Sequence, residues 1–105
     1  MKIFLDTANF EEIKQAVEWG IIDGITTNPS LLKKEAGKDL KEIICAITDL
    51  VKGPVSVEVN GTKAEEMIKE AKQYFAWDPK HIVIKVPMCE EGLKAIHRLK
   101  TAKIA

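Results

Sequence analysis

A short apolar run followed by a stretch with helical spacing occurs four times along this chain, and this alternation restricts the possible folds. The apolar runs cover residues 2–7, 24–27, 54–59 and 81–87. Apolar residues at helical spacing follow at 10–17, 40–51, 64–75 and 93–99, with a short helical stretch after Pro29 and a break near Gly37. Four such units predict a parallel sheet with right-handed crossovers. In a chain of 105 residues, we expect a single domain over residues 1–105.

Helix boundaries are marked by residues that satisfy or end the backbone hydrogen-bond pattern. Asn9 is placed to cap the first helix, with Glu12 three residues later. Thr62 and Glu65 form the same pattern before the third long helix. Gly53, followed by a proline, predicts the end of the preceding helix.

Each predicted strand has one apolar face and, on the opposite face near its carboxyl end, one polar residue. These four polar residues are Asp6, Asn28, Glu58 and Lys85. A doubly wound sheet is covered on both faces, and its strands read as nearly continuous apolar runs. A barrel points one face of every strand at a common axis and carries its catalytic residues at the carboxyl ends. The pattern therefore favours a barrel over a doubly wound sheet.

Lys85 is the least expected residue, because it lies inside the apolar strand HIVIKVPM (residues 81–88). One interpretation is a lysine on an edge strand whose stem reaches water. The other is a nucleophilic amine, kept partly neutral by desolvation, that attacks a ketone to form a Schiff base. Nearby carboxylates at Asp6 and Glu58 would favour the charged form and oppose that shift. The local pattern leaves both interpretations open.

The other three polar residues also have simple structural interpretations. Asp6 is close enough to the first helix to cap it, Asn28 precedes a proline and suits a turn, and Glu58 suits an ion pair with Lys85. Their shared face and shared strand end favour a joint role. An acid, an amide, a second acid and an amine suit proton transfer around a covalent imine.

Composition excludes several classes of function. The formal net charge is zero, which argues against nucleic acid or an anionic membrane as the main partner. No run is long enough to span a membrane, and the N-terminus does not resemble a signal peptide. Helix packing is the expected role of Trp19, Trp77, Tyr74 and Phe75. Cys45 and Cys89 fit no zinc or redox spacing, and Cys89 is expected to be a small apolar filler. His81 and His97 have no companion ligand, and no glycine-rich phosphate loop is present. We therefore expect a cytoplasmic protein with no metal and no cofactor.

Four motifs resemble the transaldolase family, and in particular its short microbial subfamily, which includes fructose-6-phosphate aldolase-like proteins. The motifs are LDTAN (5–9), GITTNPSLL (24–32), VSVEV (55–59) and IVIKVPM (82–88), in the family's order and spacing. The resemblance implies an α/β fold of the (β/α)8 barrel type and a metal-free class I aldolase mechanism, used in the pentose phosphate pathway. The substrate implied is a sugar phosphate such as fructose 6-phosphate.

The same resemblance implies a role for each candidate site residue. Lys85 matches the lysine that forms the Schiff base with the ketose. Glu58 matches the acid that acts through a water in imine formation and hydrolysis, and Asp6 the acid that moves the proton of the hydroxyl beside the broken C–C bond. Asn28 matches the amide that holds a substrate hydroxyl, and Thr26, in the same motif, is also expected to bind substrate. The aldolase branch carries Gln at the position of Glu58, so Glu58 favours transaldolase.

The chain departs from the family in length, because family members are about twice as long. It matches a (βα)4 half of the barrel and lacks the later strands and the phosphate-binding loops. Four strands cannot close a barrel of full size, and the edge strands would expose unpaired backbone groups. Two copies could pair these edges, so we expect a homo-oligomer. Two functions stay open: a transaldolase-type enzyme, or a non-catalytic half-barrel that associates with itself or complements a partner.

Overall fold

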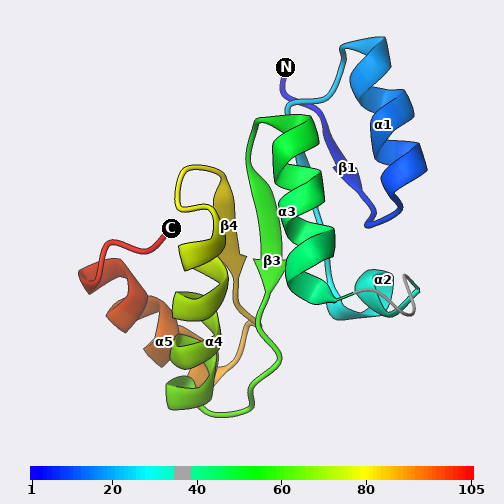
Figure 1. Cartoon of the computed structure of the whole chain (residues 1–105). Helices are drawn as coiled ribbons and strands as arrows, with labels where there is room; N and C mark the ends of the chain where they lie inside the picture. The colour runs from blue at the N-terminus through cyan, green and yellow to red at the C-terminus, as the bar shows by residue number, and fades with distance from the viewer. Residues whose placement is uncertain (35–38) are drawn as a thin grey trace.

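The computed structural model describes residues 1–34 and 39–105, which form a four-stranded parallel sheet with helices between the strands (Figure 1). The strands are β1 (Phe4–Asp6), β2 (Gly24–Thr26), β3 (Val55–Glu58) and β4 (Ile82–Lys85). The helices are α1 (Phe10–Trp19), α2 (Pro29–Lys33), α3 (Leu40–Val51), α4 (Ala64–Trp77) and α5 (Glu90–Thr101). The break expected near Gly37 lies outside the described residues.

The strand order is β1-β2-β3-β4, with every pair parallel. A doubly wound sheet reverses its order at a switch point, whereas a barrel adds each strand beside the previous one. The sequential order therefore confirms the expected (βα)4 half of a TIM-type barrel. None of the helices among the described residues is long and apolar enough to cross a membrane.

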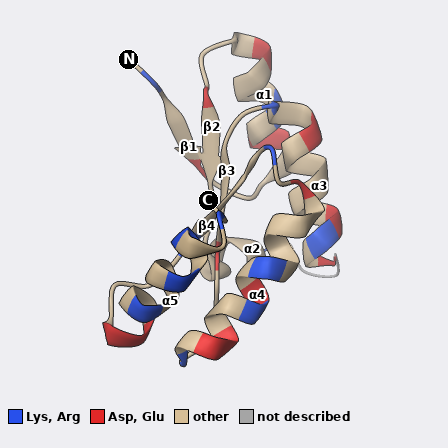
Figure 2. Ribbon diagram, turned by 90° about the vertical axis from the view of Figure 1, so that its left-hand side faces the viewer, with Lys and Arg blue, Asp and Glu red and all other residues tan. Residues whose placement is uncertain are grey.

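The two faces of the sheet differ in the way that their sequence predicts. The face under the helices is completely buried at its centre, at Ile25, Val55, Val57 and Ile82, whereas Leu5 on β1 and Ile84 on β4 are only partly buried. Figure 2 shows α1, α3 and α4 on one side of the strands. The other face, which would line the interior of a closed barrel, is open, and Phe4 is 45% exposed there.

The core consists of two apolar clusters connected through α3. Ile44 belongs to the cluster formed by β3, β4, α4 and α5, whereas Ile43 and Ile47 belong to the cluster with β2 and α1. Ile44 and Ile47 are both completely buried. Helix α3 therefore contacts both halves of the sheet through adjacent stripes of one apolar face.

The structure confirms one predicted helix cap and corrects another. The Asn9 side chain accepts a hydrogen bond from the Glu12 amide, as expected for the start of α1. The capping box predicted at Thr62 and Glu65 is wrong, because α4 begins at Ala64, after a residue that makes no side-chain cap bond. The amide of Ala64 instead donates to Glu91 Oε1 at 3.3 Å, so a carboxylate from α5 replaces the local cap.

The end of α3 also differs in detail from the prediction. The left-handed residue is Lys52, with φ of 55°, rather than the glycine that follows it. Gly53 is needed for a different reason, since a Cβ at this position would collide with the carbonyl oxygen of Asp23. The glycine permits a close approach of the loop before β3 to the loop before β2.

Candidate active site

Glu58 and Lys85 form the centre of the candidate site, at the carboxyl ends of β3 and β4. They are direct register partners, so both side chains project from the same face of the sheet. Lys85 Nζ lies 3.7 Å from Glu58 Oε2. The Lys85 side chain is 50% exposed and that of Glu58 is 20% exposed. The pair predicted from sequence therefore forms, on a face that the helices do not cover.

Asp6 and Thr26 form a second pair at the same end of the sheet. They are register partners on β1 and β2, and the Thr26 hydroxyl donates to Asp6 Oδ1 at 2.9 Å. The interpretation of Asp6 as a helix cap is wrong, because Asn9 caps α1. Asp6 thus remains on the open face, oriented by Thr26.

Asn28 joins the site from the turn after β2. Its Oδ1 accepts from the Leu31 amide at 2.9 Å and caps α2, with Pro29 in the first turn of that helix. Asn28 therefore has a structural role, but as the N-cap of α2 rather than as a turn residue. The cap occupies the amide oxygen and fixes the orientation of the side chain.

Ser56 is a polar residue on the site face that sequence reasoning did not assign to the site. It pairs in register with Thr26 and lies two residues before Glu58, so the strand period of two was the signal for it. Behind it, the buried Thr27 hydroxyl donates to the Ser56 carbonyl oxygen at 2.6 Å. This bond holds β2 against β3 directly below the site.

The loop after Lys85 is fixed by the start of α5. Cys89 is exposed and caps α5, with its Sγ accepting from the Gly92 amide at 3.4 Å, so the expectation of a buried apolar filler is wrong. A Cβ on Gly92 would collide with the Pro87 carbonyl oxygen. The helix can therefore start close to the strand that carries Lys85.

His81, at the opposite end of β4, has a partner that its sequence did not reveal. Its Nδ1 lies 2.8 Å from Asp78 Oδ2. This hydrogen bond holds the pKa of the Asp78 carboxyl below its usual range. Within the described part of the chain, no group of three His, Cys, Asp or Glu side chains is arranged to hold a metal ion.

The loop after Glu58 is organised by a carboxylate from α4. Glu70 accepts from the amides of Asn60 and Gly61, at 2.9 and 2.6 Å, and from the Tyr74 hydroxyl at 3.0 Å. Burial, followed by the hydrogen bond to Glu70, raises the pKa of Tyr74 to about 12. The direction of the chain just beyond Glu58 thus depends on a buried tyrosine and its acceptor.

This raised pKa predicts a loss of stability at alkaline pH. In the unfolded chain the tyrosine has its ordinary pKa of 10.0, so between pH 10 and about 12 the unfolded state loses the Tyr74 proton before the native state does. The contribution is complete below pH 10 and falls as the pH rises, by about 3 kcal/mol at most. We expect Tyr74→Phe to lower the free energy of unfolding by about 1 kcal/mol at pH 8. Above pH 10, the difference in free energy of unfolding between the variant and the wild type should become smaller. Denaturant unfolding of both proteins across this range provides the measurement, and a constant gap would contradict the prediction.

Sequential parallel strands, helices on one face, and polar side chains at the carboxyl strand ends define the class: one half of a TIM-type (β/α)8 barrel. The family model described as transaldolase/fructose-6-phosphate aldolase matches residues 3–105. The chain therefore belongs to the transaldolase/fructose-6-phosphate aldolase family.

Curated relatives agree with this assignment and show how much of the family fold is present. The chain is 57% identical over 96 residues to a probable transaldolase of Alkaliphilus metalliredigens, covering 91% of this chain and 44% of that relative. It is 56% identical over 99 residues to a probable transaldolase of Clostridium tetani, covering 94% and 45% respectively. A probable transaldolase of Clostridium perfringens is 52% identical over 104 residues, which cover 99% of this chain and 47% of that relative. The chain thus spans less than half the length of these relatives.

Proposed function

We propose that this chain carries the Schiff-base half of a transaldolase-type active site, which transfers a dihydroxyacetone unit between sugar phosphates in the pentose phosphate pathway. The observation that best supports this function is the register pairing of Glu58 with Lys85 at the strand ends, within the two motifs that resemble the family. We propose the cytoplasm as its location, since that is where the substrates of this pathway occur.

In the proposed reaction, Lys85 Nζ attacks the C2 carbonyl of fructose 6-phosphate. Water leaves as the imine forms, and Glu58 transfers protons through a bound water. Asp6 then accepts the C4 hydroxyl proton while the C3–C4 bond breaks, which releases glyceraldehyde 3-phosphate and leaves a three-carbon enamine on Lys85. The enamine adds to an acceptor aldose phosphate, and hydrolysis of the imine frees the lysine.

Two further residues suit the binding of substrate hydroxyl groups. The Asn28 oxygen is held by the α2 backbone, so its amide nitrogen is the end that donates to a substrate oxygen. Thr26 holds Asp6 through its hydroxyl and lies between β1 and β3 on the same face. We assign both residues to the dihydroxyacetone end of the substrate.

One observation favours a second candidate function, a non-catalytic half-barrel. Half of the Lys85 side chain is in water, and a reactive amine requires a drier site than these four strands provide. In that case Lys85 and Glu58 form an exposed ion pair that contributes less than about 1 kcal/mol to stability.

Borohydride trapping distinguishes the two candidates. The chain is incubated with fructose 6-phosphate, reduced with borohydride and mapped by mass spectrometry, beside Lys85→Ala and a control, Lys69→Ala, which removes an exposed lysine on α4. We expect a reduced three-carbon adduct on Lys85 in the wild type and the control, and none in Lys85→Ala. A folded wild-type chain with no adduct on Lys85 would exclude the enzymatic function for this chain and leave the non-catalytic half-barrel.

Replacement of Glu58 tests its proposed role in proton transfer. Glu58→Gln keeps the size and hydrogen-bonding capacity of the side chain but removes the group that accepts a proton. We expect the rate of adduct formation to fall by about 10²-fold, in line with the usual contribution of a general acid–base. Rates are measured by quenching with borohydride at increasing times. An unchanged rate would remove Glu58 from the mechanism while leaving Lys85 in it.

A further inference from the structure

The distance between Glu58 and Lys85 is not set by a direct hydrogen bond between the two side chains. Their charged atoms lie 3.7 Å apart, whereas a hydrogen bond between an ammonium group and a carboxylate is about 2.7–2.9 Å long. Each side chain is therefore placed mainly by the backbone that carries it. The spacing matters for the proposed reaction, because a displacement of about 1 Å in an active site can slow a reaction about 10²-fold.

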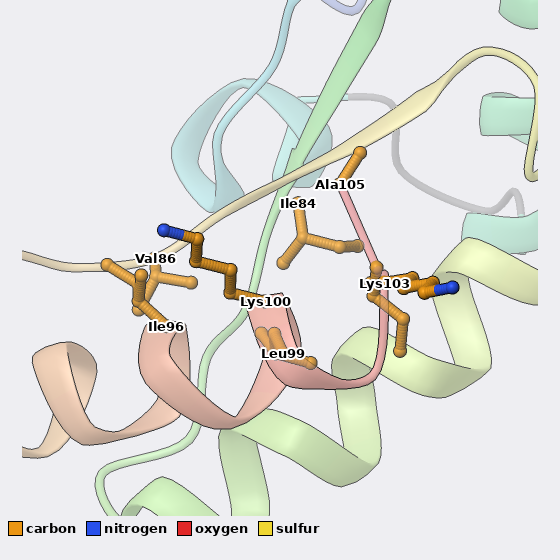
Figure 3. A pocket seen from close by; sticks show the side chains of 8 residues that line it. Ile84, Val86, Ile96, Leu99, Lys100, Lys103 and Ala105 are labelled. Carbon is orange, nitrogen blue, oxygen red and sulfur yellow. The ribbon is translucent and has the colours of Figure 1, made fainter.

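The backbone that carries Lys85 is held along both edges of β4. On the inner edge, the Val59 amide donates to the Lys85 carbonyl oxygen at 3.1 Å. On the outer edge, the Ile84 amide donates to the Ala105 carbonyl oxygen at 2.9 Å, beside the groove between β4 and α5 that Figure 3 shows. The position of Lys85 thus follows from ordinary pairing of its strand.

The backbone after Glu58 is held by a side chain, Glu70 of α4. The amides of Asn60 and Gly61, the second and third residues after Glu58, donate to its two oxygens at 2.9 and 2.6 Å. A carboxylate can accept on both oxygens, and such charge-assisted bonds are roughly twice as strong as neutral ones. Glu70 is therefore the main anchor of the chain where it leaves β3.

Glu70 is in turn oriented by Tyr74, one helical turn later on α4. The Tyr74 hydroxyl donates to Glu70 Oε2 at 3.0 Å, the oxygen that also accepts from the Asn60 amide. Tyr74 is buried, and its ring centre lies 5.1 Å from that of Trp77, which packs against the same cluster. Helix packing is thus confirmed for these two residues, whereas it is wrong for Trp19, which is 64% exposed. The anchor stands on a well-packed part of α4.

A second carboxylate, Glu91 of α5, holds the far end of the same loop. It accepts from the amide of Ala64, the first residue of α4, at 3.3 Å, and it also lies 3.0 Å from Lys94 Nζ. Figure 1 shows the loop before α4 and the loop before α5 at the same end of the sheet. The Glu91 contact is longer, involves one amide and is made six residues after Glu58. It therefore fixes the start of α4 rather than the Glu58 side chain.

We propose that Glu70 is a positioning residue that acts through Glu58. By holding the amides of Asn60 and Gly61, it keeps the Glu58 carboxylate at the distance from Lys85 that proton transfer requires. Its own bonds go to the backbone and to a tyrosine, so it has no direct part in the chemistry. The effect on rate rests on the Schiff-base function proposed for Lys85, whereas the effect on the position of Glu58 does not.

Exchange of Glu70 for glutamine tests this role, because it keeps the size of the side chain and removes one acceptor. A glutamine has a single acceptor oxygen, and its amino group would face one of the loop amides as a second donor. We expect the rate of adduct formation on Lys85 to fall by at least about 10-fold, and by no more than the roughly 10²-fold expected for Glu58→Gln. The exchange is isosteric and Glu70 is only partly buried, so the chain should fold, which circular dichroism checks.

Two further variants separate positioning from general destabilisation. The matched control, Ile44→Val, weakens the core without touching the loop and should keep the wild-type rate. If Glu70 acts through Glu58, adding Glu70→Gln to Glu58→Gln should change the rate by less than about twofold, because the group that it positions is already absent. A wild-type rate in Glu70→Gln, an equal loss in Ile44→Val, or a further loss of about 10-fold in the double variant would each overturn the proposal.

The position of Glu58 can also be measured without the reaction. Lys85→Ala removes a charge 3.7 Å from the Glu58 carboxylate and should shift its carbon-13 NMR signal. In a chain that also carries Glu70→Gln, we expect this shift to be largely lost. A wild-type chain that forms no adduct would contradict the proposed function, and this measurement would still decide the role of Glu70. A shift of undiminished size in the Glu70→Gln chain would overturn that role.

Discussion

Replacing Lys85 by arginine is expected to abolish the borohydride-trapped adduct while leaving the fold intact. Arginine keeps the positive charge and can pair with Glu58, which lies 3.7 Å from the lysine amine. Its guanidinium is always protonated and does not form a Schiff base. The adduct yield should therefore fall to background, a loss of about 10³-fold or more if Lys85 supplies the only nucleophile.

The stability of Lys85→Arg should change little, in contrast to its loss of the adduct. An exposed ion pair contributes little, so Lys85→Arg should change the free energy of unfolding by less than about 1 kcal/mol. The measurement combines adduct quantification by mass spectrometry with denaturant unfolding of the same samples. If Lys85→Arg retained the adduct, the modified group would be another amine, and the assignment of Lys85 as the nucleophile would be wrong.

Replacing Ile44 by alanine should have the largest effect on stability. Ile44 is completely buried and joins α3 to the cluster that includes Val57 and Ile82. Large-to-small substitutions of this kind cost about 2–5 kcal/mol, because the removed atoms lose their apolar environment and leave a cavity. Since domains of this size have about 5–15 kcal/mol of stability, Ile44→Ala should leave the chain marginally folded.

A graded series makes this prediction specific to packing. Ile44→Val removes one methylene group and should cost about 0.5–1.5 kcal/mol, well below the alanine variant. Urea unfolding at one fixed protein concentration gives both values, and the fixed concentration matters because association would also stabilise the native state. Equal costs for valine and alanine would show that the core around Ile44 rearranges rather than leaving a cavity.

Strand positions and side-chain faces were predictable because they depend on local periodicity. The period of two places Glu58 with Ser56, and Lys85 with Val83, whatever the partner strands are. The same rule placed Asp6 and Asn28 on the open face. The Asn9 cap was also predictable, since its acceptor and donor lie three residues apart.

The errors arose where the outcome depended on segments distant in the sequence. Glu91 of α5 accepts the hydrogen bond from the Ala64 amide, so the capping box predicted at Thr62 does not form. Cys89 is the exception, since it is exposed and makes a local cap bond to the Gly92 amide, three residues along the chain. Trp19 is exposed because β1 lies at the edge of the sheet, and helical spacing within α1 cannot reveal that position.

Local sequence pattern was enough to predict the four βα units, the apolar face of each strand, and the acid, amide, second acid and amine at the strand ends. Which of these groups meet follows from the packing of the strands: Glu58 pairs with Lys85, Asp6 is held by Thr26, and β1 and β4 lie at opposite edges of the sheet. The physical reason is that faces follow from the backbone period within a strand, whereas neighbours depend on strand order and register. Those are fixed by hydrogen bonds between segments that are 20 or more residues apart.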